Sequence, residues 1–342
     1  MGNGGPIGTS DGVCMFQGFR YEVVEGELVR TPWTVPYPKP DEVVVAVEGA
    51  GVNRADLLQL KGRYPPPAGY ANVPGLEVAG TVVAVGSKAH PWRVGDAVMG
   101  LLAAGGYASH AIINVRHVWR VPTMISTVKA ASIPEALCTS YVNLVWHGKF
   151  RPEQIVLIHS AAGGIGSTAV QLVRFLGGYG VALVGSPQKA TFVQHLGATL
   201  VLNRHLSVSQ LESAIRRDFP QGVDLILDTI GAGWETFHVR ILRHGGRWIN
   251  IGLLGGTTHT SPFPWAAFLT KELTLGATLL RNKHPQFKAR LMEEIESIIL
   301  PGYVEGRLQP VVAHILPMEQ WPQAFQWIRK GNVMGKIVLT PV

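Results

Sequence analysis

Residues 161–166 read AAGGIG, a composition typical of turns that hold phosphate groups. The turn follows an apolar run of strand type at 155–159 and precedes a helical stretch at 167–176. In that context, glycines let the backbone approach a pyrophosphate, and the helix N-terminus offers unpaired N–H groups. Ala161 stands where the usual pattern has its first glycine, and a tight turn without a ligand is the alternative. We predict a dinucleotide site that includes Ala162, Gly163, Gly164, Ile165 and Gly166.

The end of the next predicted strand, 181–184, indicates which dinucleotide binds. An Asp or Glu there would accept a hydrogen bond from a ribose 2′-hydroxyl and select NAD. Residues 185–189 read GSPQK and contain no carboxylate. Ser186 can donate to a 2′-phosphate, Lys189 can neutralise it, and Arg204, after the third strand, can add charge and stack on adenine. The alternative is that both cations are ordinary surface residues; we predict NADPH.

The elements around these motifs change character along the chain. Residues 40–125 carry short β-branched runs such as 43–47 and 80–86, separated by prolines, which predicts a small barrel-like β domain. From about residue 126, strand and helix patterns alternate, which predicts a parallel sheet covered on both faces. A strand at 273–280 and a helix at 286–299 follow, and the β runs near the C-terminus could rejoin the first domain. We therefore predict an α/β chain in three segments, namely 1–130 and 273–342 in the β-rich domain and 131–272 in a doubly wound, Rossmann-type domain.

Composition excludes several classes of protein. The chain has 342 residues, 46% hydrophobic and 15% charged, which excludes an intrinsically disordered chain. Its two cysteines exclude a disulfide scaffold and a four-cysteine zinc lobe, and they favour a reducing, cytoplasmic location. The net charge of +7 is scattered, so we do not expect nucleic-acid binding. The longest stretch without acidic or basic residues, 248–270, holds glycines and prolines, so no membrane span is expected.

Several segments resemble the medium-chain dehydrogenase/reductase superfamily, specifically its zinc-free quinone oxidoreductase branch. The segments are GVNRAD at 51–56, YPPP at 64–67, PGLEVAG at 74–80, and the 161–166 turn with Gln171. IPEA at 133–136 and LILDTIG at 225–231 are most similar to quinone oxidoreductases of the p53-inducible type, which belong to the zeta-crystallin-like group. The likeness covers about residues 40–340, whereas residues 11–27 depart from the usual opening strand. It implies a GroES-like β-rich substrate domain beside the Rossmann domain.

The resemblance also bears on zinc. Zinc-dependent relatives carry ligands at three positions, which here are Asn53, Leu76 and, by approximate alignment, Glu135. Asn is a poor zinc ligand and Leu is none, and no histidine pair has His-x-x-x-His spacing. We predict no catalytic metal. Without a Lewis acid, alcohol oxidation is disfavoured, and an acceptor that is already activated, such as a quinone or an α,β-unsaturated carbonyl, is favoured.

The resemblance implies roles for the remaining site residues. Asn53 would lie beside the nicotinamide and donate a hydrogen bond to a carbonyl oxygen, and Tyr64 would donate to developing oxyanion charge. The alternatives are a turn residue at Asn53 and a simple pocket wall at Tyr64. Glu77 fits a structural role better than acid–base work. Thr139, Gly252, Leu253 and Leu279 would line the nicotinamide pocket.

Three functions remain open at this point. The first is an NADPH-dependent quinone reductase, and the second is an enal or 2-enoyl-thioester reductase on the same scaffold. The third is a non-catalytic NADPH-binding protein with a regulatory or nucleic-acid-binding duty. Residues 273–280 resemble the strand that pairs between subunits in this family, and an exposed apolar edge strand is costly unless covered, so we predict a homodimer.

Overall fold

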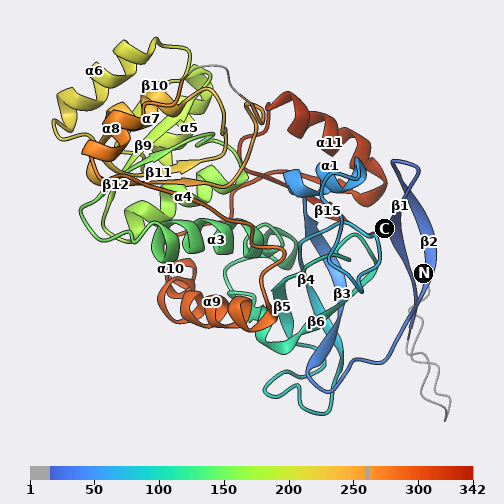
Figure 1. Cartoon of the computed structure of the whole chain (residues 1–342). Coiled ribbons are helices and arrows are strands. Elements are labelled where there is room, and N and C mark those ends of the chain that lie inside the picture. Colours follow the sequence, from blue (N-terminus) through green and yellow to red (C-terminus); the bar gives the residue numbers. More distant parts are fainter. Residues whose placement is uncertain (1–15, 259–261, 342) are drawn as a thin grey trace. The chain divides into compact units, whose positions relative to one another are not determined.

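The computed structural model describes residues 16–258 and 262–341 (Figure 1). It divides into two compact units, one formed by the described residues up to Glu135 and from Arg281 onward, and the other by Ala136–Leu280. The chain returns to the first unit at Arg281 rather than at residue 273. The reason is that strand β13 (Thr274–Ala277) pairs with β12 (Leu242–Asn250) of the second unit.

The first unit is a β domain with peripheral helices. Its main sheet has the order β14-β15-β3-β4-β5-β7, and β6 pairs with β3. The strands are β3 (Glu42–Gly51), β4 (Glu77–Val85), β5 (Ala97–Leu101), β6 (His110–Asn114), β7 (Val118–Arg120), β14 (Val312–Pro317) and β15 (Lys336–Thr340). Strand β3 is rich in valine and mostly buried, as expected for a central strand with neighbours on both sides.

An antiparallel hairpin, β1 (Phe16–Val24) and β2 (Glu27–Val35), opens the described chain. Part of the atypical segment at 11–27 is therefore an ordinary hairpin strand, and residues 11–15 lie outside the described residues. The helices of this unit are α1 (Arg54–Leu60), α2 (Thr127–Ala130), α9 (Pro285–Ile298), α10 (Leu300–Val304) and α11 (Trp321–Lys330).

The second unit is a six-stranded sheet in the order β10-β9-β8-β11-β12-β13, with every pairing parallel. The other strands are β8 (Ile155–Ile158), β9 (Tyr179–Val184), β10 (Leu200–Asn203) and β11 (Val223–Asp228). The helices are α3 (Pro134–Tyr141), which begins in the first unit, α4 (Gly164–Phe175), α5 (Pro187–His195), α6 (Val208–Asp218), α7 (Glu235–Ile241) and α8 (Trp265–Thr270). Strands β8 and β11 are almost fully buried, which confirms the predicted parallel sheet with covered faces.

Among the described residues, no helix combines the length and apolar character that crossing a bilayer requires.

Candidate active site

The glycine turn lies between β8 and α4, at the carboxyl edge of the parallel sheet. A side chain at Gly166 would come within 2.3 Å of the Ser160 carbonyl oxygen and 2.6 Å of the Ala161 Cα, so only glycine allows this approach of helix to strand. Helix α4 is 12 residues long, and its first turn contains Gly164, Ile165 and Gly166. Its N-terminal N–H groups and dipole therefore form a site suited to an anionic group such as a pyrophosphate.

Two cations and a hydroxyl lie together at the carboxyl ends of the neighbouring strands β9 and β10. Ser186 is the N-cap of α5, and its hydroxyl oxygen accepts a hydrogen bond from the Lys189 backbone N–H at 3.4 Å. The Arg204 guanidinium lies against Gly185, where a side chain would fall 3.0 Å from Arg204 Nε. Burial, and then the charge of Arg204, lower the pKa of Lys189 below its usual range. Two mutually repelling cations beside a free hydroxyl hydrogen match a phosphate dianion, since its charge would relieve their repulsion.

The residues predicted to line the nicotinamide pocket come from three elements of the second unit. Asn143 Nδ2 donates to the Thr139 carbonyl at 2.8 Å, and Thr278 Oγ1 donates to Asn143 Oδ1 at 2.6 Å. Asn143 thereby joins Thr139 on α3 to the segment that carries Leu279. It lies in a π-helical turn (Val142–His147) that continues α3, a feature often found at functional sites.

Gly252 and Leu253 follow β12 near that strand's carboxyl end. A side chain at Gly252 would come within 2.9 Å of the Thr229 carbonyl oxygen, so the two loops lie close together. The side chains of Leu253 and Leu279 are 56% and 57% exposed, which leaves them accessible to a ligand.

Asn53 in the first unit is held by a buried ion pair. Lys336 Nζ, at the start of β15, lies 2.5 Å from both Glu77 Oε1 and Asn53 Oδ1. Asn53 Nδ2 donates to Glu77 Oε1 at 3.0 Å and to the Gly51 carbonyl at 3.3 Å. The amide of Asn53 is thus fixed through all of its polar atoms, and donation to an acceptor carbonyl would require one of these bonds to exchange.

Glu77 is fully buried, and both of its oxygens are engaged. Oε2 accepts from the Glu135 backbone N–H at 2.9 Å, while Oε1 faces Lys336 and Asn53. A side chain at Gly51 would fall 2.2 Å from Glu77 Oε1, so the absence of a side chain there makes room for the carboxylate. These contacts support the structural interpretation of Glu77 over acid–base work.

A second buried carboxylate, Asp56, fixes the backbone around this pair. Its oxygens accept from the backbone N–H groups of Asn53 at 2.7 Å and Gly75 at 3.0 Å, and from the Tyr107 hydroxyl at 2.9 Å. Burial raises the pKa of Asp56, and these hydrogen bonds oppose the rise. Asp56 therefore ties α1 to the PGLEVAG segment.

Tyr64 lies half-buried in the proline-containing loop after α1. Burial, and then the charge of Glu135, raise its pKa to about 12, while the charge of Arg281 acts in the opposite direction. At neutral pH the phenol is protonated, so Tyr64 is a hydrogen-bond donor and not a base.

The sequence did not single out Lys336, Arg281 or Asn143. A lone Lys at the start of a strand and a lone Arg after one give no local signal, because their partners are distant in the chain. Asn143 is equally inconspicuous beside Thr139.

A buried cluster in the second unit has the residue types of a metal site. Ligand atoms of His159, Asp228 and His238 lie within 4.8 Å of one another. The two Nε2 atoms are 2.7 Å apart, the distance of an N–H···N hydrogen bond, whereas two nitrogens on one tetrahedral zinc would be about 3.3 Å apart.

Asp228 is also occupied by other donors. It accepts from two backbone N–H groups, from Trp248 Nε1 at 2.9 Å and from Asn250 Nδ2 at 2.9 Å. Burial lowers the pKa of His159 to about 4 and that of His238 well below its usual range, so both imidazoles are neutral at pH 7. This cluster is a hydrogen-bonded core pair.

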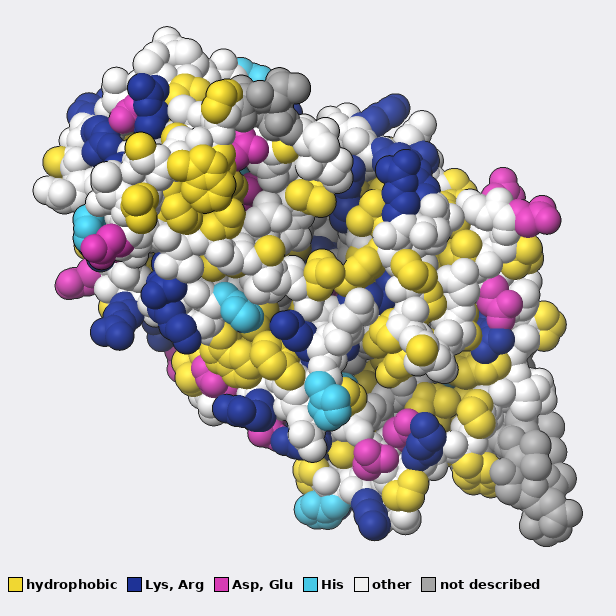
Figure 2. Space-filling view, in the orientation of Figure 1, with side chains coloured by type: hydrophobic (Ala, Val, Ile, Leu, Met, Phe, Trp, Pro, Cys, Tyr) yellow, Lys and Arg dark blue, Asp and Glu magenta, His cyan; other side chains and the backbone are white. Residues whose placement is uncertain are grey.

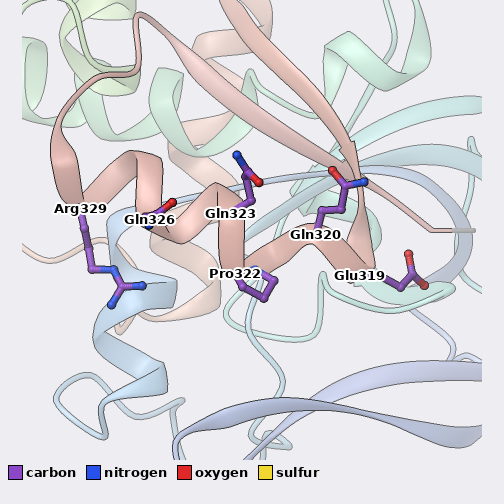
Figure 3. Close-up of a pocket in the computed structure, with 6 residues that line it drawn as sticks. All are labelled: Glu319, Gln320, Pro322, Gln323, Gln326 and Arg329. Atoms are coloured by element: carbon purple, nitrogen blue, oxygen red, sulfur yellow. The ribbon is translucent and has the colours of Figure 1, made fainter.

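A surface hollow of about 490 Å³ lies along α11 and the turn before it. Its six lining residues follow one another along the helix and do not converge on a common point (Figure 3). None of them is a predicted site residue, and the hollow contributes nothing to the candidate site.

Comparisons with known protein families match both units. Residues 39–123 match the alcohol dehydrogenase GroES-like domain, and residues 164–297 match the zinc-binding dehydrogenase domain. The names describe these families as a whole, and the three positions that carry zinc ligands in zinc-dependent relatives hold Asn53, Leu76 and Glu135 here.

Individual proteins are similar over nearly the whole chain. Human quinone oxidoreductase is 28% identical over 91% of this chain and 92% of its own length. Polyketide synthase GfsB of Streptomyces halstedii is 33% identical over 92% of this chain, which spans only 5% of that much longer protein.

Solved structures share the fold. The CurK enoyl reductase has a TM-score of 0.82 at 26% identity, covering 96% of this chain and 100% of its own. The Escherichia coli quinone oxidoreductase, solved with NADPH, also has a TM-score of 0.82, at 24% identity over 95% of this chain and 99% of its own.

Proposed function

The chain belongs to the medium-chain dehydrogenase/reductase superfamily of oxidoreductases, and on that premise we propose that it is an NADPH-dependent quinone reductase. The observation that carries the proposal is the cluster of Ser186, Lys189 and Arg204 beyond a dinucleotide-type turn. It supports a cofactor with an extra phosphate, since no carboxylate stands at 185–189.

In this proposal, different residues of the second unit bind different parts of the cofactor. The first turn of α4 binds the pyrophosphate, and Lys189 and Arg204 bind the 2′-phosphate. Thr139, Gly252, Leu253 and Leu279 line the nicotinamide pocket. When bound, NADPH supplies a hydride to the acceptor, and one proton from the protein or solvent completes the two-electron reduction of a quinone to a hydroquinone.

The first unit supplies the polar groups for the acceptor. Tyr64, protonated at neutral pH, donates a hydrogen bond or a proton to the oxygen on which negative charge develops. Asn53 can donate a hydrogen bond to the acceptor only when its Nδ2 gives up a hydrogen bond to Glu77 or to the Gly51 carbonyl. The proposal includes no catalytic zinc: Leu76 carries no ligand atom, and Asn53 Oδ1 already accepts from an ammonium.

A second candidate is reduction of a 2-enoyl thioester or an enal. The likeness to the CurK enoyl reductase and to a polyketide synthase favours it. The same hydride and proton would be added across a carbon–carbon double bond conjugated to a carbonyl, and Tyr64 would again serve the enolate oxygen.

We also propose a homodimer that pairs through β13. This strand ends the six-stranded sheet, and Leu275 on it is 48% exposed. Nearby on α8, Trp265 and Leu269 are 69% and 77% exposed, and hydrophobic side chains gather on this face (Figure 2). Sedimentation at micromolar concentration measures the oligomeric state, and a monomer contradicts the proposed dimer.

We also propose that the protein is located in the cytoplasm.

The proposed reaction is tested by following the oxidation of NADPH and NADH with an ortho-quinone, with a 2-enoyl thioester, and with neither. Quinone-dependent loss of NADPH, with NADH much slower, supports the proposal. A preference for the thioester selects the second candidate, and equal rates with both cofactors contradict the phosphate site.

Tight NADPH binding without turnover of either acceptor favours the non-catalytic alternative.

The phosphate site is tested separately by the double variant Lys189→Ala/Arg204→Ala. Compared with the exposed control Arg329→Ala, this variant is expected to weaken NADPH binding about 10- to 100-fold while leaving NADH binding unchanged.

A further inference from the structure

Arg281 is a buried cation that the proposed reaction has not yet used. It is the first residue of the segment that returns to the first unit, and its side chain is almost completely buried. Nε donates to the Ala103 carbonyl at 2.6 Å, and Nη2 donates to Gln59 Oε1 at 2.6 Å. The Arg281 carbonyl in turn accepts from the buried Lys288 Nζ at 2.6 Å. The guanidinium is therefore held in one orientation.

The same guanidinium contacts Tyr64 in two ways. Nη1 donates to the Tyr64 backbone carbonyl at 2.9 Å, and the guanidinium carbon lies 5.0 Å from the centroid of the phenol ring. The first contact fixes the loop, and the second, a cation–π contact, fixes the ring. A half-buried tyrosine in a loop would otherwise be free to change rotamer.

We propose that Arg281 is a positioning residue for Tyr64, which holds the loop and the ring in place and sets its positive charge against the phenol ring whose hydroxyl donates to the acceptor. The inference rests on the proposed function, because Tyr64 must contact the acceptor. An arginine is needed because its planar guanidinium donates at fixed angles to three oxygens. These are the Ala103 carbonyl, the Tyr64 carbonyl and Gln59 Oε1. Lysine offers a point charge without this geometry.

The charges around Tyr64 explain why a cation is needed there. Burial and the carboxylate of Glu135 both oppose any negative charge on the phenol oxygen, and Arg281 is the cation that opposes them. Burial lowers the pKa of Arg281, and the charges of Tyr64, Asp56 and Glu135 act in the opposite direction. When the phenol gives up a proton or shares one in a transition state, the Arg281 charge lowers the energy of the developing phenolate.

The kinetic test compares Arg281→Lys and Arg281→Gln with Arg290→Lys, an exposed arginine on α9 that serves as the control. We expect kcat to fall about tenfold in Arg281→Lys and further in Arg281→Gln, with KM for NADPH within about twofold of the parent. Arg290→Lys should match the parent.

The same substitutions in a Tyr64→Phe background separate positioning from general stability. If Arg281 acts through Tyr64, Arg281→Lys lowers kcat no further once the hydroxyl is gone. An equal fall in both backgrounds would overturn the proposal, as would an unchanged kcat in Arg281→Gln.

A spectroscopic readout does not depend on turnover. In protein labelled with 3-fluorotyrosine, the 19F resonance of Tyr64 is assigned by its absence from Tyr64→Phe. Arg281→Lys should move or broaden that resonance and leave the other tyrosine signals in place. A shift without activity on any acceptor would retain the positioning role and reject the proposed reaction, whereas an unmoved Tyr64 signal would reject the positioning role.

Discussion

Each unit contains a buried polar cluster that can be compared with one in the other unit, and the two clusters differ in charge. In the first unit, Glu77 and Lys336 form an ion pair around Asn53, with both charged side chains at most 5% exposed. In the second, His159 and His238 share one hydrogen bond and are both neutral. A buried charge is tolerated when an opposite charge and hydrogen bonds compensate it, and a group without a partner charge is buried in its neutral form.

The two clusters are therefore destabilised by different changes. The ion pair is destabilised when one partner is removed, because the other charge is then buried without an opposite charge. The histidine pair is destabilised when a proton is added, because burial penalises the charged imidazole more than the nearby charge of Asp228 compensates it. Asp228 also accepts hydrogen bonds from Trp248, Asn250 and backbone N–H groups.

The largest effect is expected for Lys336→Met, which leaves Glu77 charged and unpaired. We expect a loss of about 3–5 kcal/mol in the free energy of unfolding, measured by urea denaturation. Lys330→Met, at the exposed end of α11, is the control and should cost less than about 0.5 kcal/mol. The double variant Lys336→Met/Glu77→Gln should be more stable than Lys336→Met alone, and simple addition of the two losses would contradict the ion-pair interpretation.

The second effect is a loss of stability in acid, to which the buried histidine pair of the second unit makes the largest contribution. Burial also lowers the pKa values of His110 and His117 in the first unit, which act in the same direction. The pKa of His159 lies at about 4 in the folded state, below its ordinary value of 6.5. The stabilisation is therefore complete above pH 6.5 and is lost as the pH falls from 6.5 towards 4, by an amount on the order of 3 kcal/mol. Asp56 acts oppositely, because its raised pKa favours the folded state as pH falls. Unfolding at pH 7 and pH 5 measures the difference, and equal stability at both would contradict the neutral pair.

A smaller effect is expected for His238→Phe at neutral pH. The substitution leaves His159 Nε2 without its partner, but it also removes the buried His238 Nδ1, which has no hydrogen-bond partner. The net cost should therefore be that of one lost hydrogen bond, about 1 kcal/mol. The acid-dependent loss should shrink at the same time, since one titrating group is gone. His205→Phe, at an exposed position, is the control and should retain the acid dependence of the parent.

The smallest effect is expected for an ion pair on the surface. Arg116 and Glu293 lie 2.7 Å apart, with side chains 48% and 55% exposed. Arg116→Ala should change the free energy of unfolding by less than about 1 kcal/mol, and that change should fall with added salt. A loss of unfolding free energy as large as that of Lys336→Met would contradict the expectation that buried ion pairs matter more than exposed ones.

Much of the fold was predictable from local patterns. The strand predicted at 273–280 is β13 at Thr274–Ala277, and the helix predicted at 286–299 is α9 at Pro285–Ile298. The return to the first unit was placed too early, because a short strand carries no mark of the sheet that it joins. That assignment depends on pairing with β12, which is a tertiary property.

The candidate site residues of the two units were not equally predictable. The dinucleotide turn is local, because strand, glycines and helix are consecutive and their geometry follows from the missing side chain at Gly166. The two cations that follow β9 and β10 are predictable for a related reason, since these strands pair in parallel and end at one edge of the sheet. The groups around Tyr64 and Asn53 lie far apart in the chain, and no spacing rule brings them together.

Local patterns in the sequence specify the superfamily, the alternation that builds the parallel sheet, and a turn of the type that can bind a dinucleotide. Which residues hold Asn53 and Tyr64 depends on the tertiary structure. Lys336 is 283 residues from Asn53 and Arg281 is 217 residues from Tyr64, yet each makes a hydrogen bond to its partner. The physical reason is that a local motif is specified by backbone geometry within a few residues. A buried charge finds its partner only when the whole domain has folded and excluded water.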